Sequence, residues 1–218
     1  MSERLTIVPT VEHRYTLVFL HGFQMQALDL LEDFTCIQEQ CPHWRIVLPQ
    51  APVLAITAHE GNSTPSWYDY LTDTDGASED YIDFASLRVR RVELEALLRA
   101  EAELLKNAQK QADYSRLFVG GLSQGGTMAL DLATHIALGG VVTLAAPRLS
   151  ASLRRPLLCT WNGLFATNDT IFPSSWAAPL YTEATATWCD AEHDLEGVDT
   201  VTYVATTLQK FQTPRKDK

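Results

Sequence analysis

The stretch GGLSQGG (residues 120–126) decides the fold, because it stands where an apolar strand turns directly into a helix. Residues 117–119 before it are bulky and apolar, and the segment after it has helical spacing. Residues 121–125 fit the pattern G-x-S-x-G, in which a serine projects from a strained strand-to-helix turn and glycines avoid collisions on either side. The helix that follows points its free N–H groups at the site, where they suit a developing oxyanion. The pattern predicts Ser123 as a nucleophile; the alternative is a glycine-rich turn with an incidental serine.

Strands and helices alternate on both sides of this turn. Short apolar runs predict strands at 15–20, 45–48, 116–119, 141–144, within 156–165 and at 185–189. Helical spacing of apolar residues predicts helices at 27–40, 84–110, 125–136 and 201–211. Residues 49–80, rich in proline, glycine and small polar residues, are expected to form a long loop region. This order predicts a single α/β domain over 1–218, with a core at about 15–212 and a doubly wound, mostly parallel sheet flanked by helices.

Composition excludes several functional classes. The 218 residues are 46% hydrophobic and carry a formal net charge of -10, and the longest basic cluster is Arg88-Val-Arg-Arg91. Nucleic-acid binding is disfavoured, because phosphate recognition needs a concentrated positive face. The sequence has no signal-like leader and no apolar run near ~18 residues, so we expect a cytoplasmic protein without stable membrane insertion. The four cysteines lack CxxC spacing, so we expect them to be reduced and to hold no metal.

A serine nucleophile needs a base, and in this kind of site the histidine follows the serine and the acid in the chain. Of six histidines, only His135 and His193 come after Ser123. His135 stands about three turns down the helix that begins at the serine, far from its N-terminus. His193 stands in a polar stretch after a predicted strand, so we predict that it is the base.

The acid should lie between Ser123 and His193. Candidates are Asp131, Asp169, Glu183, Asp190 and Glu192. Asp131 is on the helix after the serine, and Asp190 and Glu192 share the histidine's own loop. Asp169 follows a strand end, where open α/β sheets present site residues, although an aspartate after asparagine is also common in plain turns. We predict Asp169 as the acid.

Two N–H groups are expected to form the oxyanion hole. One belongs to Gln124, the residue after the nucleophile, and the second usually comes from the loop after an earlier strand. His21 and Gly22 end the first apolar strand, so we predict the N–H of Phe23 as the second donor. His-Gly could also simply end the strand.

Five segments carry a resemblance to a known family. They are VFLHGF (18–23), LPQAP (48–52), PSWYDY (65–70), SRLFVGGLSQGGTMAL (115–130) and TNDTIFP (167–173). In this order, over about residues 15–212, the chain resembles the acyl-protein thioesterase or phospholipase/carboxylesterase family of small serine α/β-hydrolases. The resemblance implies a seven-stranded sheet without a large cap domain, the triad Ser123, Asp169 and His193, and no cofactor. It also implies hydrolysis of ester or thioester bonds in small-molecule, lipid or acyl-protein substrates with apolar acyl groups, as acyl-protein thioesterases, carboxylesterases and lysophospholipases do.

The substrate-binding residues are less defined than the triad. The resemblance places PSWYDY on a loop beside the acyl site, and with it Trp67. Leu54, Phe172 and Phe23 could line an acyl pocket with Trp67, or all four could pack in the core.

The chain departs from the family pattern at two places. Gln24 and Met25 stand where the family usually has Gly-Asp, and Phe165 and Ala166 stand where it usually has His-Gly. These departures keep two alternatives open: a hydrolase-fold binding protein with weak or no turnover, and a short-chain carboxylesterase. The sequence predicts no oligomeric state.

Overall fold

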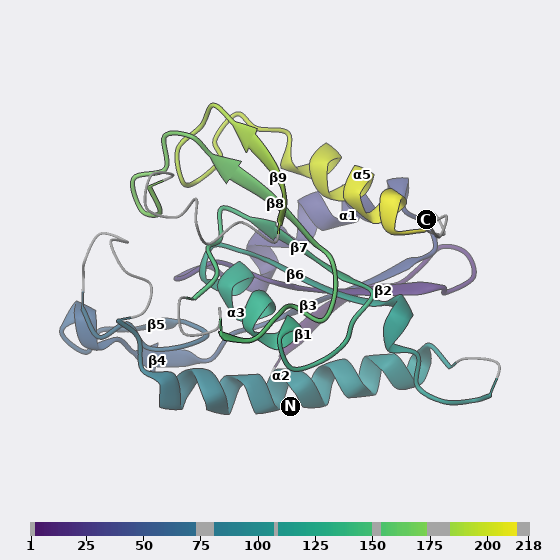
Figure 1. The fold of residues 1–218 in the computed structure, drawn as a ribbon, viewed down its shortest axis with the longest axis horizontal. Coiled ribbons are helices and arrows are strands. Elements are labelled where there is room, and N and C mark those ends of the chain that lie inside the picture. Colours follow the sequence, from purple (N-terminus) through teal and green to yellow (C-terminus); the bar gives the residue numbers. More distant parts are fainter. Residues whose placement is uncertain (1–2, 73–80, 107–108, 150–153, 174–183, 213–218) are drawn as a thin grey trace.

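A central seven-stranded sheet organises the molecule (Figure 1). The computed structural model describes residues 3–72, 81–106, 109–149, 154–173 and 184–212. The strands lie in the order β1-β3-β2-β6-β7-β8-β9. Their bounds are β1 Arg4–Ile7, β2 Tyr15–Leu20, β3 Trp44–Pro49, β6 Leu117–Leu122, β7 Gly140–Leu144, β8 Trp161–Ala166 and β9 Ala184–Cys189.

All neighbouring strands of this sheet are parallel except β1, which pairs antiparallel with β3. The run YTLVFL forms β2, whose last five residues are all buried. A parallel strand covered on both faces reads as a continuous apolar run, and this explains why β2 shows no alternation. The predicted doubly wound, mostly parallel sheet is confirmed.

Helices cover both faces of the sheet, as Figure 1 shows. Helices α1 (Leu31–Gln40) and α5 (Thr200–Gln212) lie together on one face, and α3 (Gln124–Ala133) and α2 (Phe84–Leu104) lie together on the other. Successive residues of a strand point to opposite faces, so Leu17 joins the core under α1 and α5, whereas Val18 joins the core under α2 and α3. The sheet thus separates two apolar cores.

Four sequence predictions about elements need correction. Strand β1 begins before the expected core at residue 15, and the expected loop region 49–80 contains a small antiparallel hairpin, β4 (Val53–Ala55) with β5 (Ser63–Pro65). Helix α2 ends at Leu104 rather than near 110, because Leu105 leaves the helical conformation and its N–H turns back to Ala102. Helix α3 likewise ends at Ala133 instead of 136.

Helix α2 is attached to the sheet and to α3 by ion pairs. Glu101, whose side chain is 1% exposed, accepts a hydrogen bond from Arg45 Nε of β3 at 2.8 Å. Arg91 forms a two-pronged pair with Asp131 of α3, at 2.6 and 3.1 Å.

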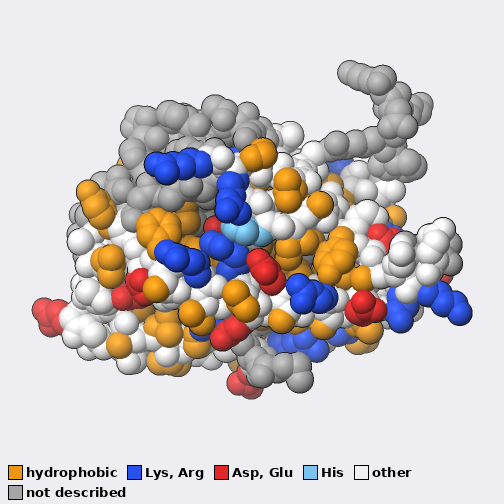
Figure 2. Space-filling model, turned by 60° about the horizontal axis from the view of Figure 1, so that its bottom comes forward, with side chains coloured by type: hydrophobic (Ala, Val, Ile, Leu, Met, Phe, Trp, Pro, Cys, Tyr) orange, Lys and Arg blue, Asp and Glu red, His pale blue; other side chains and the backbone are white. Residues whose placement is uncertain are grey.

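Figure 2 turns the α2 side toward the reader, where arginine and lysine side chains alternate with acidic and apolar ones. In the described part of the chain, no helix has the length and apolar character needed to span a membrane.

Candidate active site

Ser123 occupies a strained turn between β6 and α3. Its φ of 49° and ψ of -120° lie outside the regions that L-residues prefer. Its N–H donates to Leu144 O of β7 at 2.8 Å, and its carbonyl accepts the N–H of Thr127 at 3.0 Å. The neighbouring strand and the first turn of α3 therefore hold the backbone in this conformation.

The glycines of the opening motif are required by close approach. A Cβ on Gly121 would come within 2.3 Å of Gly125 C, and a Cβ on Gly125 within 2.3 Å of Leu20 O. The two outer glycines, at 120 and 126, are needed for packing against β7 and the residue Ala146, with hypothetical Cβ contacts of 2.5 and 2.4 Å. Every glycine of GGLSQGG is thus fixed by contact with backbone or with a small side chain.

The structure brings Ser123, His193 and Asp169 into one chain of hydrogen bonds. Ser123 Oγ lies 2.8 Å from His193 Nε2, and His193 Nδ1 lies 2.9 Å from Asp169 Oδ2. Since the ionised carboxylate only accepts, Nδ1 carries the proton and donates to it, and this leaves Nε2 to accept from the serine hydroxyl. The His193 side chain is 21% exposed and that of Asp169 only 4%. The arrangement can remove a proton from Ser123 and return it.

Two loops at the ends of β8 and β9 set Asp169 and His193 beside each other. The other carboxylate oxygen, Asp169 Oδ1, accepts the N–H groups of Ile171 at 2.9 Å and Phe172 at 2.7 Å. Asn168 joins the loops, since its N–H donates to Ala191 O at 3.0 Å and its side-chain amide donates to Asp190 Oδ1 at 2.7 Å. The sequence reasoning did not identify this role of Asn168, which precedes the acid by one residue.

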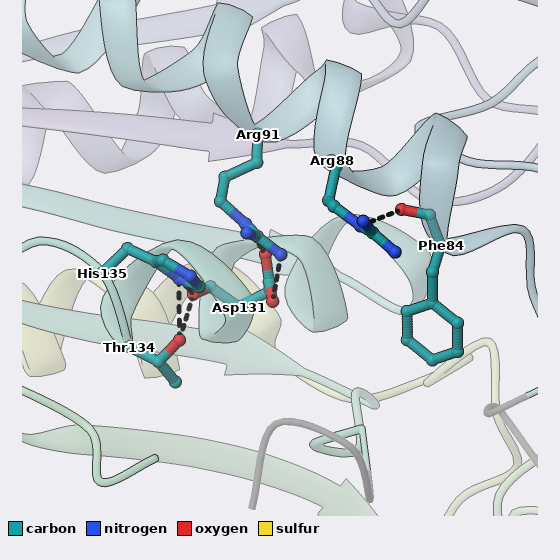
Figure 3. A network of polar contacts seen from close by, with 6 residues as sticks. All are labelled: Phe84, Arg88, Arg91, Asp131, Thr134 and His135. Carbon is teal, nitrogen blue, oxygen red and sulfur yellow. Dashed lines mark hydrogen bonds and ion pairs between the residues drawn. The ribbon is translucent and has the colours of Figure 1, made fainter. Parts of the chain in front are cut away.

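Two of the other candidates, Asp131 and His135, lie in a separate network (Figure 3), and Glu183 lies outside the described residues. Asp131 faces Arg91 of α2, and His135 Nδ1 lies 2.9 Å from both Thr134 Oγ1 and Asp131 O. The Thr134 hydroxyl itself donates to Asp131 O at 2.7 Å. These groups pack α2 against α3 and have no hydrogen bond to Ser123.

The loop after β2 is held by a buried histidine. His21 Nε2 accepts the N–H of Ala51 at 3.0 Å, so Nδ1 carries the proton that is donated to Gly22 O at 2.8 Å. Burial lowers the pKa of His21, although the bond to Gly22 O opposes this. Gln24, with a φ of 64°, donates its N–H to Pro65 O at 3.0 Å. Among the described residues, nothing accepts the N–H of Phe23 or of Gln124, so both donors remain open for a ligand.

The side chain of Gln124 links the two predicted oxyanion donors, a role that the sequence reasoning missed. It is buried; its Oε1 accepts the N–H of Trp67 at 2.9 Å, and its Nε2 donates to Ser66 Oγ at 2.9 Å and to Tyr68 O at 3.1 Å. The Trp67 indole Nε1 in turn donates to His21 O at 2.8 Å. PSWYDY is therefore bonded to both the nucleophile turn and the β2 loop.

The predicted substrate-binding residues occupy different environments. Phe172 is 2% exposed and its ring lies 5.1 Å from the His193 ring. Trp67 is 1% exposed, and Leu54 is half-buried on β4. The Phe23 ring stands edge-on to that of Tyr70, at 5.1 Å and 88°. Tyr70, the last residue of PSWYDY, is thus an apolar neighbour of the loop that the sequence reasoning did not single out.

The residues that depart from the family pattern are packed against their neighbours in this structure. Met25 Sδ would lie 3.0 Å from a Cβ placed on Gly22, so the methionine fills the space above that glycine. Phe165 and Ala166 are each 2% exposed, and the Phe165 ring packs on Trp188 at 5.2 Å. They contribute to the core and end β8 just before the acid loop.

Cys41 and Cys159 are poorly suited to act as competing nucleophiles. All four are free, and burial raises the pKa of Cys41 and of Cys159 to about 11. A thiol with so high a pKa is scarcely ionised at neutral pH, and the thiolate is the reactive form. In the segments that the structure describes, no group of three or more His, Cys, Asp or Glu could hold a metal ion.

Comparison with known proteins places these features in a family. The family model described as phospholipase/carboxylesterase matches residues 2–198. An acyl-protein thioesterase 1 of Mycosarcoma maydis is 33% identical over 157 residues, which cover 66% of this chain and 60% of the relative. One of Cryptococcus neoformans is 28% identical over 147 residues, covering 66% and 58%. The matches thus span about three fifths of these relatives.

Solved structures agree on the fold. The acyl-protein thioesterase 2 of Zea mays superposes with a TM-score of 0.78 at 18% identity, covering 97% of this chain and 99% of that one. The central parallel sheet, the nucleophile turn and the absence of a large cap domain among the described residues are those of an α/β-hydrolase. Because the family model matches nearly the whole chain, the protein belongs to the phospholipase/carboxylesterase family of α/β-hydrolases.

Proposed function

We propose that this protein is a serine hydrolase that cleaves carboxylic ester or thioester bonds of apolar acyl substrates through an acyl-enzyme on Ser123. The observation that carries the proposal is the unbroken hydrogen-bond chain from Ser123 Oγ through His193 to Asp169. Membership of the phospholipase/carboxylesterase family and relatives named acyl-protein thioesterase support the type of bond. The reaction uses side chains and backbone of the chain itself and requires no cofactor.

In the first half-reaction, Ser123 Oγ attacks the acyl carbonyl carbon while His193 Nε2 takes the hydroxyl proton. The carboxylate of Asp169 stabilises the imidazolium that forms and holds its Nδ1–H in place. The tetrahedral intermediate collapses by breaking the bond from the acyl carbon to sulfur or oxygen. His193 gives its proton to the leaving thiolate or alkoxide, and the acyl group remains on Ser123.

In the second half-reaction, water replaces the leaving group and attacks the acyl-enzyme, with His193 Nε2 accepting its proton. Collapse of the second intermediate returns that proton to Ser123 Oγ and releases a carboxylic acid. Negative charge develops on the acyl oxygen in both intermediates. The N–H groups of Phe23 and Gln124 are the proposed donors to it, and α3 adds the partial positive charge of its N-terminus.

The side chains near the triad favour an apolar acyl group. Phe172 packs on the base, and Phe23 packs on Tyr70 beside the oxyanion loop. Two apolar side chains of these loops, Leu71 and Ile171, are 44% and 39% exposed. We infer that Phe23, Leu54 and Phe172 contact the acyl group, and that Trp67 supports the site from behind while closing its apolar wall. Acylated proteins, lipids and small esters in the cytoplasm are the proposed substrates.

Labelling with a fluorophosphonate probe tests the proposal. We expect covalent labelling of the folded protein, with the added mass on the peptide that contains Ser123. Ser123→Ala should abolish the label, and His193→Ala should slow it strongly. Ser63→Ala, on the exposed strand β5, and His135→Ala are the matched controls and should label normally. Absence of labelling in the folded wild-type protein would favour a binding protein without turnover.

A chain-length profile separates the two enzymatic candidates. Rates on p-nitrophenyl esters and acyl thioesters of increasing length should rise toward long chains if the exposed apolar side chains bind the acyl group. A sharp maximum at acetyl or butyryl substrates would instead identify a short-chain carboxylesterase.

A further inference from the structure

A small hollow lies between α2, the end of α3 and the segment before β8. Its volume is about 290 Å³, at the small end of ligand pockets, so it suits a compact polar group. Three arginines line it, Arg88, Arg91 and Arg155, and among the described lining residues Asp131 is the one acid. Asp131 stands about 12 Å along α3 from Ser123, and no triad residue lines the hollow. The proposed hydrolysis therefore does not use this place.

The three arginines have hydrogen-bond donors that the protein itself leaves available. Arg91 donates Nε and Nη2 to Asp131, at 2.6 and 3.1 Å, which leaves its Nη1. Arg88 donates Nε to Phe84 O at 3.1 Å, and neither of its Nη groups has a partner among the described residues. For Arg155, only the backbone carbonyl is bonded in the described part of the chain, so its whole guanidinium is available. A ligand with several acceptor oxygens can be bound by all three.

The charge of the hollow is positive in a protein that is negative as a whole. Three guanidinium groups and one carboxylate sum to two positive charges, whereas the formal net charge of the chain is -10. The pair with Arg91 neutralises Asp131, so the charges of Arg88 and Arg155 have no opposite charge in the lining. Figure 2 shows this concentration as blue side chains gathered around a pale-blue histidine.

The positions of Arg88 and Arg91 on α2 also favour an anion between them. The two residues are three apart on one helix face, where like charges repel each other. Figure 3 shows both side chains extending from α2 toward the end of α3 that carries Asp131 and His135. An anion bound there would remove the repulsion and join α2 to the segment that carries Arg155.

We propose that this hollow binds a phosphate group, either inorganic phosphate or that of a small phosphate monoester. Near neutral pH such a group carries close to two negative charges, which match the two positive charges of the lining. Its oxygens accept hydrogen bonds from several directions, and guanidinium groups bind phosphate through paired N–H donors. A carboxylate has one charge and two oxygens, so it matches the three arginines less well. Phe84, Leu87 and Leu149 line the same hollow and can contact the organic part of an ester.

Titration calorimetry with inorganic phosphate and with phenyl phosphate tests the site. Low salt is needed, because exposed charges are screened at high ionic strength. The variants Arg88→Met and Arg155→Met each remove one exposed guanidinium and leave the pair of Arg91 with Asp131 intact. Arg99→Met is the matched control, since this exposed arginine of α2 does not line the hollow and its loss changes the net charge equally. Urea unfolding establishes that each variant is folded.

We expect saturable binding of about one phosphate per chain to the wild type and to Arg99→Met. Arg88→Met and Arg155→Met should each bind about tenfold more weakly, the lower end for a hydrogen bond between charged groups, because both side chains are exposed. Benzoate should bind more weakly than phenyl phosphate, which has the same ring and a larger charge.

Four results would overturn the proposal. They are no saturable binding of either phosphate to the wild type, unchanged affinity in both Arg88→Met and Arg155→Met, an equal loss in Arg99→Met, and benzoate binding as tightly as phenyl phosphate. Vesicles that contain phosphatidic acid distinguish a lipid source of the phosphate group from a soluble one. Binding to these vesicles without binding of soluble phosphate would also contradict a site for small phosphates. Fluorophosphonate labelling of Ser123 should be the same in all these variants, so the two proposals can fail independently.

Discussion

Replacing Gln124 by methionine tests whether its side chain holds the oxyanion loop. Methionine matches glutamine in length but makes none of its three hydrogen bonds to the Ser66–Tyr68 segment. The backbone N–H of residue 124 remains, so the variant keeps the proposed donor and changes only its support. The experiment separates the position of the loop from the chemistry of the donor.

The expected loss of stability follows from which partners remain. The Trp67 N–H loses its acceptor in a buried environment, at a cost of about 1–3 kcal/mol. Tyr68 O still accepts from Ser66 Oγ at 2.6 Å, so each of the two other bonds should account for only about 0.5–1.5 kcal/mol. Together the unfolding free energy should fall by about 2–6 kcal/mol, measured from the urea midpoint at unchanged m-value.

The activity of Gln124→Met should also fall, because the loop that carries the N–H of Phe23 loses its support. If Trp67 no longer holds His21 O, the N–H of Phe23 moves away from the developing oxyanion, and one such donor is worth about 10²–10³ in kcat. The assay is kcat on a p-nitrophenyl ester together with the rate of fluorophosphonate labelling. Trp67→Phe, which removes the indole N–H together with part of the buried ring, should also lower kcat. A Gln124→Met variant within about 0.5 kcal/mol of the wild type and with unchanged kcat would refute this account of the loop.

Three further predictions concern single groups. Asp169→Asn should keep the fold but lower kcat by up to about 10⁴, because the histidine loses the carboxylate that fixes its tautomer; near-normal kcat would remove Asp169 from the mechanism. Burial holds the pKa of His21 below its unfolded value of about 6.5, so the unfolded chain binds the proton first as pH falls. The free energy of unfolding should therefore be flat above pH ~6.5 and decline below it by up to about 1.4 kcal/mol per pH unit. His21→Gln should flatten that decline, measured by urea unfolding at each pH. Arg91→Met should lower stability by about 3–5 kcal/mol by leaving Asp131 buried and unpaired, with kcat unchanged, and adding Asp131→Leu should recover most of the loss; no recovery would mean that the pair is not the cause.

The fold was largely predictable because its centre is locally encoded. Strand β2 is a continuous apolar run, and the turn after β6 carries its glycines within seven residues. Strand β1 escaped prediction because it has only four residues with half-exposed alternation, and it forms through antiparallel pairing with β3, about forty residues later. Such an edge strand depends on its partner more than on its own sequence. The hairpin of β4 and β5 escaped for the same reason, with three residues in each strand.

The candidate site was predictable where chain order restricts the choice. Only one histidine after Ser123 could reach the helix N-terminus, and one aspartate follows a neighbouring strand end. The roles of Gln124 and Trp67 were not predictable in the same way, since their side chains act across separations of 57 and 46 residues. Spacing along the chain does not predict which backbone groups a buried side-chain amide will bond.

Residue 124 divides its functions between backbone and side chain, and this bears on whether the site acts on substrates. Its N–H has no acceptor among the described residues, while its side-chain amide bonds three groups of the PSWYDY loop. The strained backbone of Ser123, with φ at 49°, costs about 1–3 kcal/mol and persists only where its surroundings fix it. Those surroundings are the Leu144 carbonyl, the close contacts at the four glycines and the hydrogen bonds of the Gln124 side chain to the PSWYDY loop. A pocket that only bound acyl groups would need the apolar side chains but neither the strained backbone nor the hydrogen bond from the Ser123 hydroxyl to His193. The structure therefore favours turnover over binding, and labelling of Ser123 is the measurement on which this preference depends.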